Sequence, residues 1–363
     1  MTKAALLNHR LVNQQISETV FKTPQEIVSW MVAMQAQEYA MSKWAIALRL
    51  KGITEQDVEK AFNEGLILRT HLLRPTWHFV TPTDIRWLIG LSAPRVETVM
   101  AFYNRELGLE RNLFNKCNNL ITKALEGGKH LTRAAIAAEL LRSDIPLNGR
   151  QIGHVMMQAE LDCIVCSGAR QGKQFTYALF DERVPAAKPM PREEALALLA
   201  HKYFSSRGPA TIKDFSVWSG LTLTEAKKGA AAMSSSAFFE ETFEGKTYIL
   251  PFENPSGIFN RAATSLSKSF LMPDYDEYGM GYIDRSAIFN PIKITPDFKR
   301  NNPVFNRMII IDGIIEGTWQ RTLKGKSIVV ETFPFHILNK TQSSALSKAV
   351  ERFANFAGHK LES

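Results

Sequence analysis

The segment TPQEIVSWMVAMQAQEY, residues 23–39, joins a helix start, an apolar helical face and a polar end. Thr23 is a residue type that caps helices, and Pro24 suits the first helical position. The apolar residues that follow recur at helical spacing: Ile27, Val28, Trp30, Met31 and Met34. The sequence therefore predicts a helix that runs into a polar pair.

That pair is Gln35 and Gln37, which lie one residue apart. A helix turns by about 100° per residue, so positions i and i+2 point to nearly opposite sides. Both amides can face one site only if the helix ends or breaks here, or if the segment is extended. Neutral amides are poor general bases, so a site built from them suits a group that leaves easily. The alternative is two polar residues at a helix terminus, one on each side.

The segments that follow have helical and then strand patterns. The predicted elements are helices at about 42–50 and 54–62 and strands at 66–70 and 76–80. Gly52 ends the first of these helices, Thr54 caps the second, and the segment 73–75 forms the turn between the strands. Three helices followed by a hairpin is the order of a winged helix, a helix-turn-helix with a β-wing.

The same order recurs twice along the chain. The second copy has predicted helices at 115–125, 131–141 and 149–161 and strands at 163–166 and 174–179. The third has predicted helices at 193–204, 211–218 and 222–233 and strands at 238–243 and 247–250. Repeated units of this size support each other by stacking, so a tandem array is predicted.

The last hundred residues differ from these copies. Strands are predicted at 269–273, 307–319 and 327–333, the second as a hairpin with an Asp-Gly turn, and a closing amphipathic helix at 341–356. The predicted fold class is therefore α+β, three tandem winged-helix units and a small β-rich C-terminal domain. The predicted domain bounds are 1–110, 111–184, 185–262 and 263–363.

Composition bounds the class of protein. The 363 residues are 45% hydrophobic and 22% charged, an ordinary globular balance, and the formal net charge is +8. A basic surplus makes a polyanion a plausible partner, nucleic acid first. Three cysteines argue against a secreted disulfide framework. No apolar run approaches the roughly 20 residues of a membrane span, and the N-terminus does not have the pattern of a signal peptide. A cytoplasmic monomer without membrane contact is expected.

Two hairpins are candidate nucleic-acid contacts. In the first, the predicted contacts are Arg69, His71, Arg74, Trp77 and His78. The arginines would touch phosphates and the aromatic rings would stack or wedge, or else the tip is merely solvated and the tryptophan fills the core. The second hairpin has the tip SGARQGK, which carries Arg170 and Lys173.

Two further clusters contain residue types that occur in metal or acid–base sites. Cys163-x-x-Cys166 lacks the second ligand pair of a zinc site, so we expect two small core residues on opposite faces of a strand. The acidic cluster Asp274, Asp276 and Glu277 could bind a hard cation or perform acid–base chemistry; the alternative is an acidic turn paired with Arg285. We predict no metal and no cofactor.

Four stretches resemble the AlkZ/YcaQ-like winged-helix DNA glycosylases: MVAMQAQEYA, RTHLLRPTWHFVTP, FLMPDYDEYGMGYIDR and IIIDGIIEGTWQR. The Gln-x-Gln form is similar to the AlkZ branch, whereas the YcaQ branch has Gln-x-Asp. The resemblance implies three winged helices in a C shape that hydrolyse the bond between an alkylated purine and its deoxyribose in double-stranded DNA, including interstrand crosslinks. It further implies that Gln35 and Gln37 carry catalysis and that the hairpin at Arg170 to Lys173 approaches the DNA groove.

Two non-enzymatic hypotheses stand beside this one. A winged-helix regulator would bind a specific DNA sequence and release no base. A protein scaffold would not use its basic wings, and a steep loss of DNA affinity with rising salt would argue against it.

Overall fold

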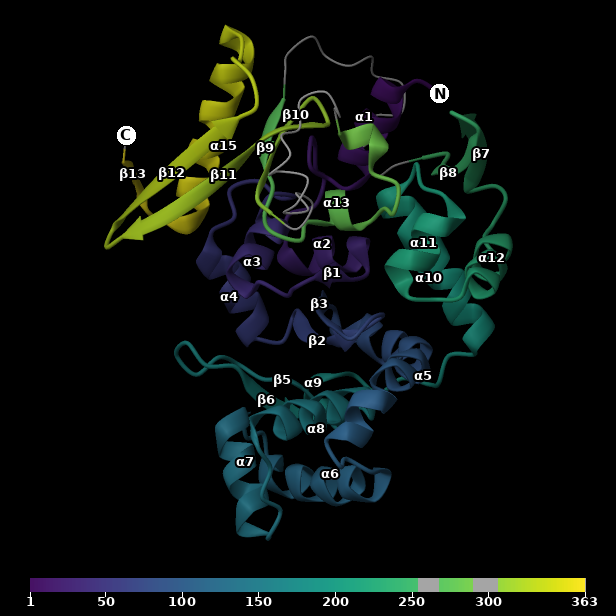
Figure 1. Cartoon of the computed structure of the whole chain (residues 1–363), viewed down its shortest axis with the longest axis vertical. Helices are drawn as coiled ribbons and strands as arrows, with labels where there is room; N and C mark the ends of the chain where they lie inside the picture. Colours follow the sequence, from purple (N-terminus) through teal and green to yellow (C-terminus); the bar gives the residue numbers. More distant parts are fainter. Residues whose placement is uncertain (254–267, 290–305, 363) are drawn as a thin grey trace.

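The computed structural model describes residues 1–253, 268–289 and 306–362, and it is a mixed α+β structure (Figure 1). The predicted boundary between residues 262 and 263 lies outside the described residues. Within them are a five-stranded sheet, two three-stranded sheets and a two-stranded sheet. No helix of the described residues combines the length and apolar character needed to cross a membrane.

The first set of elements follows the predicted order. Its bounds are α2 Pro24–Met31, α3 Tyr39–Ala47, α4 Glu55–Asn63, β2 Leu68–Leu72 and β3 Thr76–Val80. Thr23 caps α2 through a reciprocal capping box with Glu26, as the sequence predicts. One strand, β1 (Met34–Gln35), was not predicted; it pairs antiparallel with β3 and completes the sheet in the order β1-β3-β2.

The second and third sets also place three helices before a hairpin. The second consists of α6 Arg111–Leu125, β4 Leu131–Thr132, α7 Arg133–Arg142, α8 Gly149–Leu161, β5 Val165–Ser167 and β6 Thr176–Leu179. The third consists of α10 Arg192–Arg207, α11 Ile212–Ser219, α12 Leu223–Ala231, β7 Phe238–Phe243 and β8 Lys246–Pro251. A short helix, α9 (Phe180–Arg183), precedes the connection between them.

The two cysteines do not share a strand, contrary to the prediction. Cys163 lies before β5 with a φ of 54°, whereas Cys166 is inside it and fully buried. Burial raises the pKa of Cys163 to about 11 and that of Cys166 to about 12. The backbone turns at Cys163 because α8 must reverse into the strand. Both thiols are therefore protonated at neutral pH and pack in the protein interior.

Two of the longer helices were not predicted. They are α1 (Lys3–Asn13) and α5 (Pro82–Glu106), a 25-residue helix that contains Pro94. Helix α5 packs against β2, α8 and α10, so it connects the first set to the other two. Internal proline disfavours a helix by about 3 kcal/mol, which is why local pattern concealed α5.

The C-terminal part is one sheet with a helix on it. Its elements are β9 Ser269–Leu271, α13 Glu277–Met280, the 3₁₀ turn Ser286–Ile288, β10 Met308–Ile311, β11 Ile314–Lys324, β12 Ser327–Pro334, α15 Lys340–Ala357 and β13 Lys360–Glu362. The sheet order is β13-β12-β11-β10-β9 (Figure 1). Asp312 and Gly313 both have positive φ in the β10–β11 turn, as the predicted Asp-Gly hairpin requires.

The apolar cores do not follow the predicted domains. One core joins the first set of helices to the C-terminal sheet, where Trp44 of α3 donates to the Leu271 carbonyl. A second core joins the β2–β3 hairpin to α5 and the third set, and a third belongs to the second set. The segment that contains Gln35 and Gln37 lies where the first two cores meet, because Met34 and Ala36 belong to one and Ala33 to the other.

Candidate functional site

The glutamine pair lies outside a helix, with Gln35 in a strand and Gln37 at a bend. Helix α2 ends at Met31, Val32 has a φ of 57°, and Gln35 is then the register partner of His78 in β3. The Ala36 amide continues this pairing by donating to the Trp77 carbonyl at 2.7 Å. One of the stated conditions for a shared site is therefore met, because the helix ends before the pair: Gln35 lies in β1, and Gln37 follows at a bend before α3.

Two residues from distant parts of the chain set this conformation. Arg207, the last residue of α10, donates to the carbonyls of Met31 at 2.9 Å and Ala33 at 2.8 Å. Glu277 of α13 accepts the Gln35 amide at 2.9 Å through Oε1. These bonds occupy main-chain groups that a continuing helix would need for itself. We call Arg207 and Glu277 the buried clamp.

The buried clamp is an ion pair in which both side chains are almost fully buried. Arg207 donates to Glu277 Oε2 at 3.0 and 2.7 Å, and the Trp218 indole donates to the same oxygen at 2.9 Å. Burial alone would raise the pKa of Glu277, but the Arg207 charge and the Gln35 amide outweigh it and lower that pKa overall. Glu277 is therefore an anion that holds main chain, which is unlike a proton donor.

The acidic cluster pairs with arginines, although not with Arg285. The two carboxylate oxygens of Asp276 accept hydrogen bonds from the two terminal nitrogens of Arg49, each at 2.9 Å. Arg307 Nε lies 3.0 Å from Asp274 Oδ2. Arg285 instead donates to the Gly279 carbonyl. The alternative of a pairing with Arg285 was wrong, because the arginines that bind these carboxylates come from other parts of the chain, Arg49 from just after α3 and Arg307 from just before β10. Within residues 1–253, 268–289 and 306–362, no group of three acidic, His or Cys side chains could hold a metal ion.

The two amides differ in their surroundings. Gln37 is exposed, and its Oε1 accepts the Trp77 amide at 3.3 Å. Gln35 is only 7% exposed, and its Oε1 is buried without a hydrogen-bond partner among the described residues. A buried acceptor without a donor costs about 1–3 kcal/mol, so such an atom requires an explanation.

His78, the cross-strand partner of Gln35, presents a second such atom. It is 0% exposed, and its Nδ1 lies 3.0 Å from the Thr76 carbonyl. A carbonyl only accepts, so Nδ1 carries the proton and Nε2 is an acceptor, which is also buried without a partner. Burial and the Arg74 charge lower the pKa of His78 to about 3, so the ring is neutral at physiological pH. Cross-strand partners lie on one face, so this face of the sheet carries two acceptors that lack donors.

The buried His78 predicts a pH-dependent stability. An unfolded histidine titrates near 6.5, so between that pH and 3 the unfolded state binds more protons and stability falls as pH falls. Arg74 and His71 oppose protonation of the ring, and Glu277 favours it. We expect wild type to lose about 1.4 kcal/mol per pH unit through this group below pH 6.5.

Urea denaturation of wild type and His78→Gln between pH 7 and 5 measures this loss. The difference in stability between the two proteins should change with that slope, since all other titrating groups are shared. A constant difference over this range would show that His78 is not buried in the neutral form.

Arg69 and Trp77 flank the glutamine segment. Arg69 donates from Nε to the Ala36 carbonyl, between the two glutamines, at 3.0 Å. Its guanidinium lies 4.1 Å from the Trp77 ring centre and 4.7 Å from that of Phe175. Burial lowers the pKa of Arg69 to about 10, which leaves it charged at neutral pH. The first hairpin thus contributes a fixed cation beside the glutamines.

The second hairpin also reaches this region. The Arg170 amide donates to Asn63 Oδ1 at the end of α4, and its guanidinium lies 4.8 Å from the Tyr39 ring centre. Lys173 is exposed at the tip of the same loop. Residues from both predicted hairpins are therefore brought together around the glutamine segment, as Figure 1 shows for β2–β3 and β5–β6.

Three predicted contacts have other surroundings. His78 lies inside the protein, where its ring has no surface to present to DNA. His71 is 8% exposed, and Glu160 Oε2 accepts both from its amide and, at 2.6 Å, from its Nδ1. Arg74 donates to the Val217 carbonyl of α11 at the junction with the third set. Pattern in one hairpin cannot distinguish a solvated side from one that other elements cover.

No local sequence pattern singles out Arg207 or Trp218. The one local feature of Arg207 is its place as a charged residue at the end of α10. Its partners lie about 70 to 176 positions away, so no local pattern identifies them.

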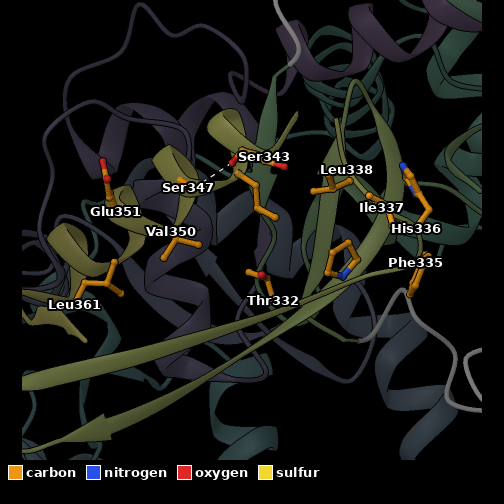
Figure 2. Close-up of a pocket in the computed structure, with 12 residues that line it drawn as sticks. Thr332, Phe335, His336, Ile337, Leu338, Ser343, Ser347, Val350, Glu351 and Leu361 are labelled. Carbon is orange, nitrogen blue, oxygen red and sulfur yellow. Dashed lines mark hydrogen bonds between the residues drawn. The ribbon is translucent and has the colours of Figure 1, made fainter. Parts of the chain in front are cut away.

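A large pocket lies away from the glutamine segment. It has a volume of about 900 Å³ and lies between β12 and α15, where Thr332, Leu338 and Val350 are among its lining residues (Figure 2). Neither glutamine and neither member of the buried clamp lines it. Size alone therefore does not identify the functional site.

Comparisons with known proteins identify a family for this chain. A family model described as DNA glycosylase AlkZ-like matches residues 28–356. A curated protein from Streptomyces sahachiroi, the interstrand DNA cross-link repair glycosylase, is 20% identical over 336 residues, 90% of this chain and 89% of its own length. The solved structure of the Streptomyces sahachiroi DNA glycosylase AlkZ superposes with a TM-score of 0.78 at 18% identity, covering 100% of this chain and 99% of that one. Since the family model spans most of its length, including both glutamines, the chain belongs to the AlkZ-like DNA glycosylase family.

Proposed function

We propose that this DNA glycosylase hydrolyses the N-glycosidic bond of cationic alkylated purines in duplex DNA, with Gln35 and Gln37 as its catalytic residues. The observation that carries this proposal is the buried Gln35 Oε1, an acceptor that has no donor among the described residues and lies two positions before Gln37 in the sequence. A water molecule satisfies such an atom, and hydrolysis needs a water held in position.

The chemistry suits neutral amides. A purine alkylated on its imidazole ring is cationic and leaves readily, so no strong acid is needed to protonate it. The protein must hold water beneath the sugar and stabilise the oxocarbenium-like state. Amide oxygens accept hydrogen bonds from that water and turn partial negative charge toward the sugar. The neutral His78 Nε2, also an acceptor, supports the same water position. Poor action on neutral, undamaged bases follows.

The three sets of helices and hairpins are proposed to be winged-helix units within 1–110, 111–184 and 185–262, followed by a C-terminal domain at 263–363. The repeated order of elements supports this division. We propose that the protein acts as a monomer on double-stranded DNA, with phosphate and base contacts from Arg69, Arg74, Trp77, Arg170 and Lys173. His71 and His78 are proposed to support these contacts from inside, because both are buried.

Interstrand crosslinks are proposed as substrates too. The relative from Streptomyces sahachiroi is named for cross-link repair. A crosslinked base cannot be turned fully out of the duplex while it is tethered to both strands. Gln37 is exposed and not enclosed, so it supports attack on a base that stays close to the helix.

Base release from duplex DNA that carries one purine methylated at ring nitrogen seven tests this proposal. We expect the Gln35→Ala, Gln37→Ala double variant to lose about 100-fold or more in single-turnover rate, the usual effect of removing an electrostatic group aimed at the transition state. Gln56→Ala, an exposed glutamine on α4, is the matched control and should keep the wild-type rate.

Absence of base release together with sequence-selective DNA binding would contradict the proposal. If wild type releases no base from this lesion or from a crosslinked duplex, while it binds one DNA sequence selectively, the enzyme assignment for this member fails. The regulator hypothesis would then replace it.

A further inference from the structure

A pocket of about 520 Å³ lies beside the glutamine segment, between the first and second sets of elements. Arg69 and Trp77 line it from the β2–β3 hairpin, and Lys173 lines it from the β5–β6 loop. The first residues of α7, from Thr132 to Ala134, complete one wall. Figure 1 shows β5 and β6 beneath the β2–β3 hairpin.

Arg69 is a buried cation, and some of its hydrogen-bond donors have no acceptor among the described residues. It is 7% exposed, and of its guanidinium nitrogens only Nε has a hydrogen-bond partner among the described residues, the Ala36 carbonyl. No carboxylate oxygen of the described part lies within ion-pair distance. The guanidinium packs against the rings of Trp77 and Phe175, and the Arg69 side chain is one of those that line the pocket. A fixed, unpaired guanidinium is a binding group for a planar or tetrahedral oxyanion.

The start of α7 is an independent second feature. Thr132 caps this ten-residue helix by accepting the Ala135 amide at 3.2 Å. The amides of Arg133 and Ala134 have no acceptor among the described residues, and the first turn contains no acidic residue. Free amides and the helix dipole together favour an anion at this position.

The side chains that line the pocket carry a net positive charge, which also favours an anion. Arg69, Arg133 and Lys173 line it, and the last two are exposed. Glu160 is the single lining carboxylate, and its Oε2 is already bound to the His71 amide and ring. Three cations against one engaged carboxylate leave a net positive pocket.

We propose that this pocket binds one backbone phosphate of the substrate DNA, close to the target nucleotide. The inference rests on the proposed function and deepens it, since it assigns where the substrate backbone is held. One planar group joins the two sites: Arg69 holds the glutamine segment through Nε and reaches the phosphate through its terminal nitrogens. A phosphate bound here sets the position of the sugar relative to Gln35 and Gln37.

The test replaces single phosphates with neutral methylphosphonate linkages, at the three positions on each side of one methylated purine. Affinity for each duplex is measured with wild type and with the double variant Arg133→Gln, Lys173→Gln. These side chains are exposed, so the variant keeps the core and the Arg69 contacts. Lys227→Gln, Lys228→Gln, on the exposed side of α12, removes equal charge elsewhere and serves as the control.

One linkage, or two neighbouring ones, should weaken wild-type binding by about tenfold, as expected for lost charge-assisted hydrogen bonds. The same linkages should cost the double variant clearly less, whereas the control should match wild type. The salt slope of the double variant should fall by about one to two. Equal losses in wild type and double variant at all positions, or no sensitive position, would overturn the proposal.

Two further arms separate the sources of failure. Inorganic phosphate should compete weakly with DNA for the protein, more than chloride does at equal ionic strength. If phosphate competes but no methylphosphonate linkage weakens DNA binding, the pocket binds free phosphate and the assignment to a DNA phosphate is overturned. The affinity measurement does not depend on base release. A sensitive linkage in a protein that releases no base would therefore support the phosphate pocket while the proposed function fails.

Discussion

Glu277→Ala is expected to abolish most base release and to destabilise the protein by about 3–5 kcal/mol, the usual cost of breaking a buried ion pair on one side. The variant leaves Arg207, which is fully buried, without its counter-charge. It also frees the Gln35 amide, so the segment from Met31 to Gln35 loses one of the two groups that hold it extended. Urea denaturation measures the first effect, and single-turnover base release from methylated duplex measures the second.

Glu277→Gln separates these effects. Its amide oxygen can still accept the Gln35 amide, although the charge facing Arg207 is gone. We expect a large loss of stability with a smaller loss of rate per folded molecule than Glu277→Ala shows. Rates are compared at a temperature where circular dichroism shows both variants folded. A folded Glu277→Ala protein that releases base at the wild-type rate would rule out a positioning role.

Asp276→Ala is expected to cost a similar 3–5 kcal/mol, yet to leave the rate per folded molecule close to that of wild type. Arg49 binds both carboxylate oxygens of Asp276 at 2.9 Å, and both side chains are fully buried. Besides Asp276, the Arg49 guanidinium donates to the Ala45 carbonyl and to the Gln14 side chain, and neither of these residues lies in the glutamine segment.

This variant is the natural comparison for Glu277→Ala, because the two carboxylates are neighbours in sequence and equal in burial. If Asp276→Ala loses as much rate per folded molecule as Glu277→Ala, the catalytic loss reflects general disturbance of α13. The buried clamp would then have no special connection to the glutamines.

Much of the local structure could be predicted from the sequence. Thr23 and Pro24 begin α2 as the sequence predicts, β3 has its predicted bounds, and the Asp312-Gly313 turn joins β10 to β11. These features depend on caps, periodicity and turn residues that act over a few positions. Helix α5 was missed because Pro94 opposes helix locally, while packing against β2, α8 and α10 stabilises it.

The candidate site was predicted in part. The sequence places Gln35 and Gln37 together and, through resemblance, connects them with a glycosylase family that the family model confirms. It does not reveal whether the pair lies in a helix or in extended backbone. Nor does it distinguish the buried His78 from the half-buried Trp77, its neighbour in the same strand. Burial depends on which distant elements cover each face.

The sequence by itself determined the order of three helices and a hairpin within each set, the basic charge and the polar pair at the end of an apolar run. Only the tertiary structure decided that Gln35 lies extended along β3, since Glu277 of α13 accepts its amide and Arg207 of α10 binds the carbonyl of Ala33 just before it. It also decided that Arg69 meets the start of α7 in one pocket. The physical reason is range: caps and periodicity act between neighbours, whereas a buried charge is stable only beside a partner that folding brings to it.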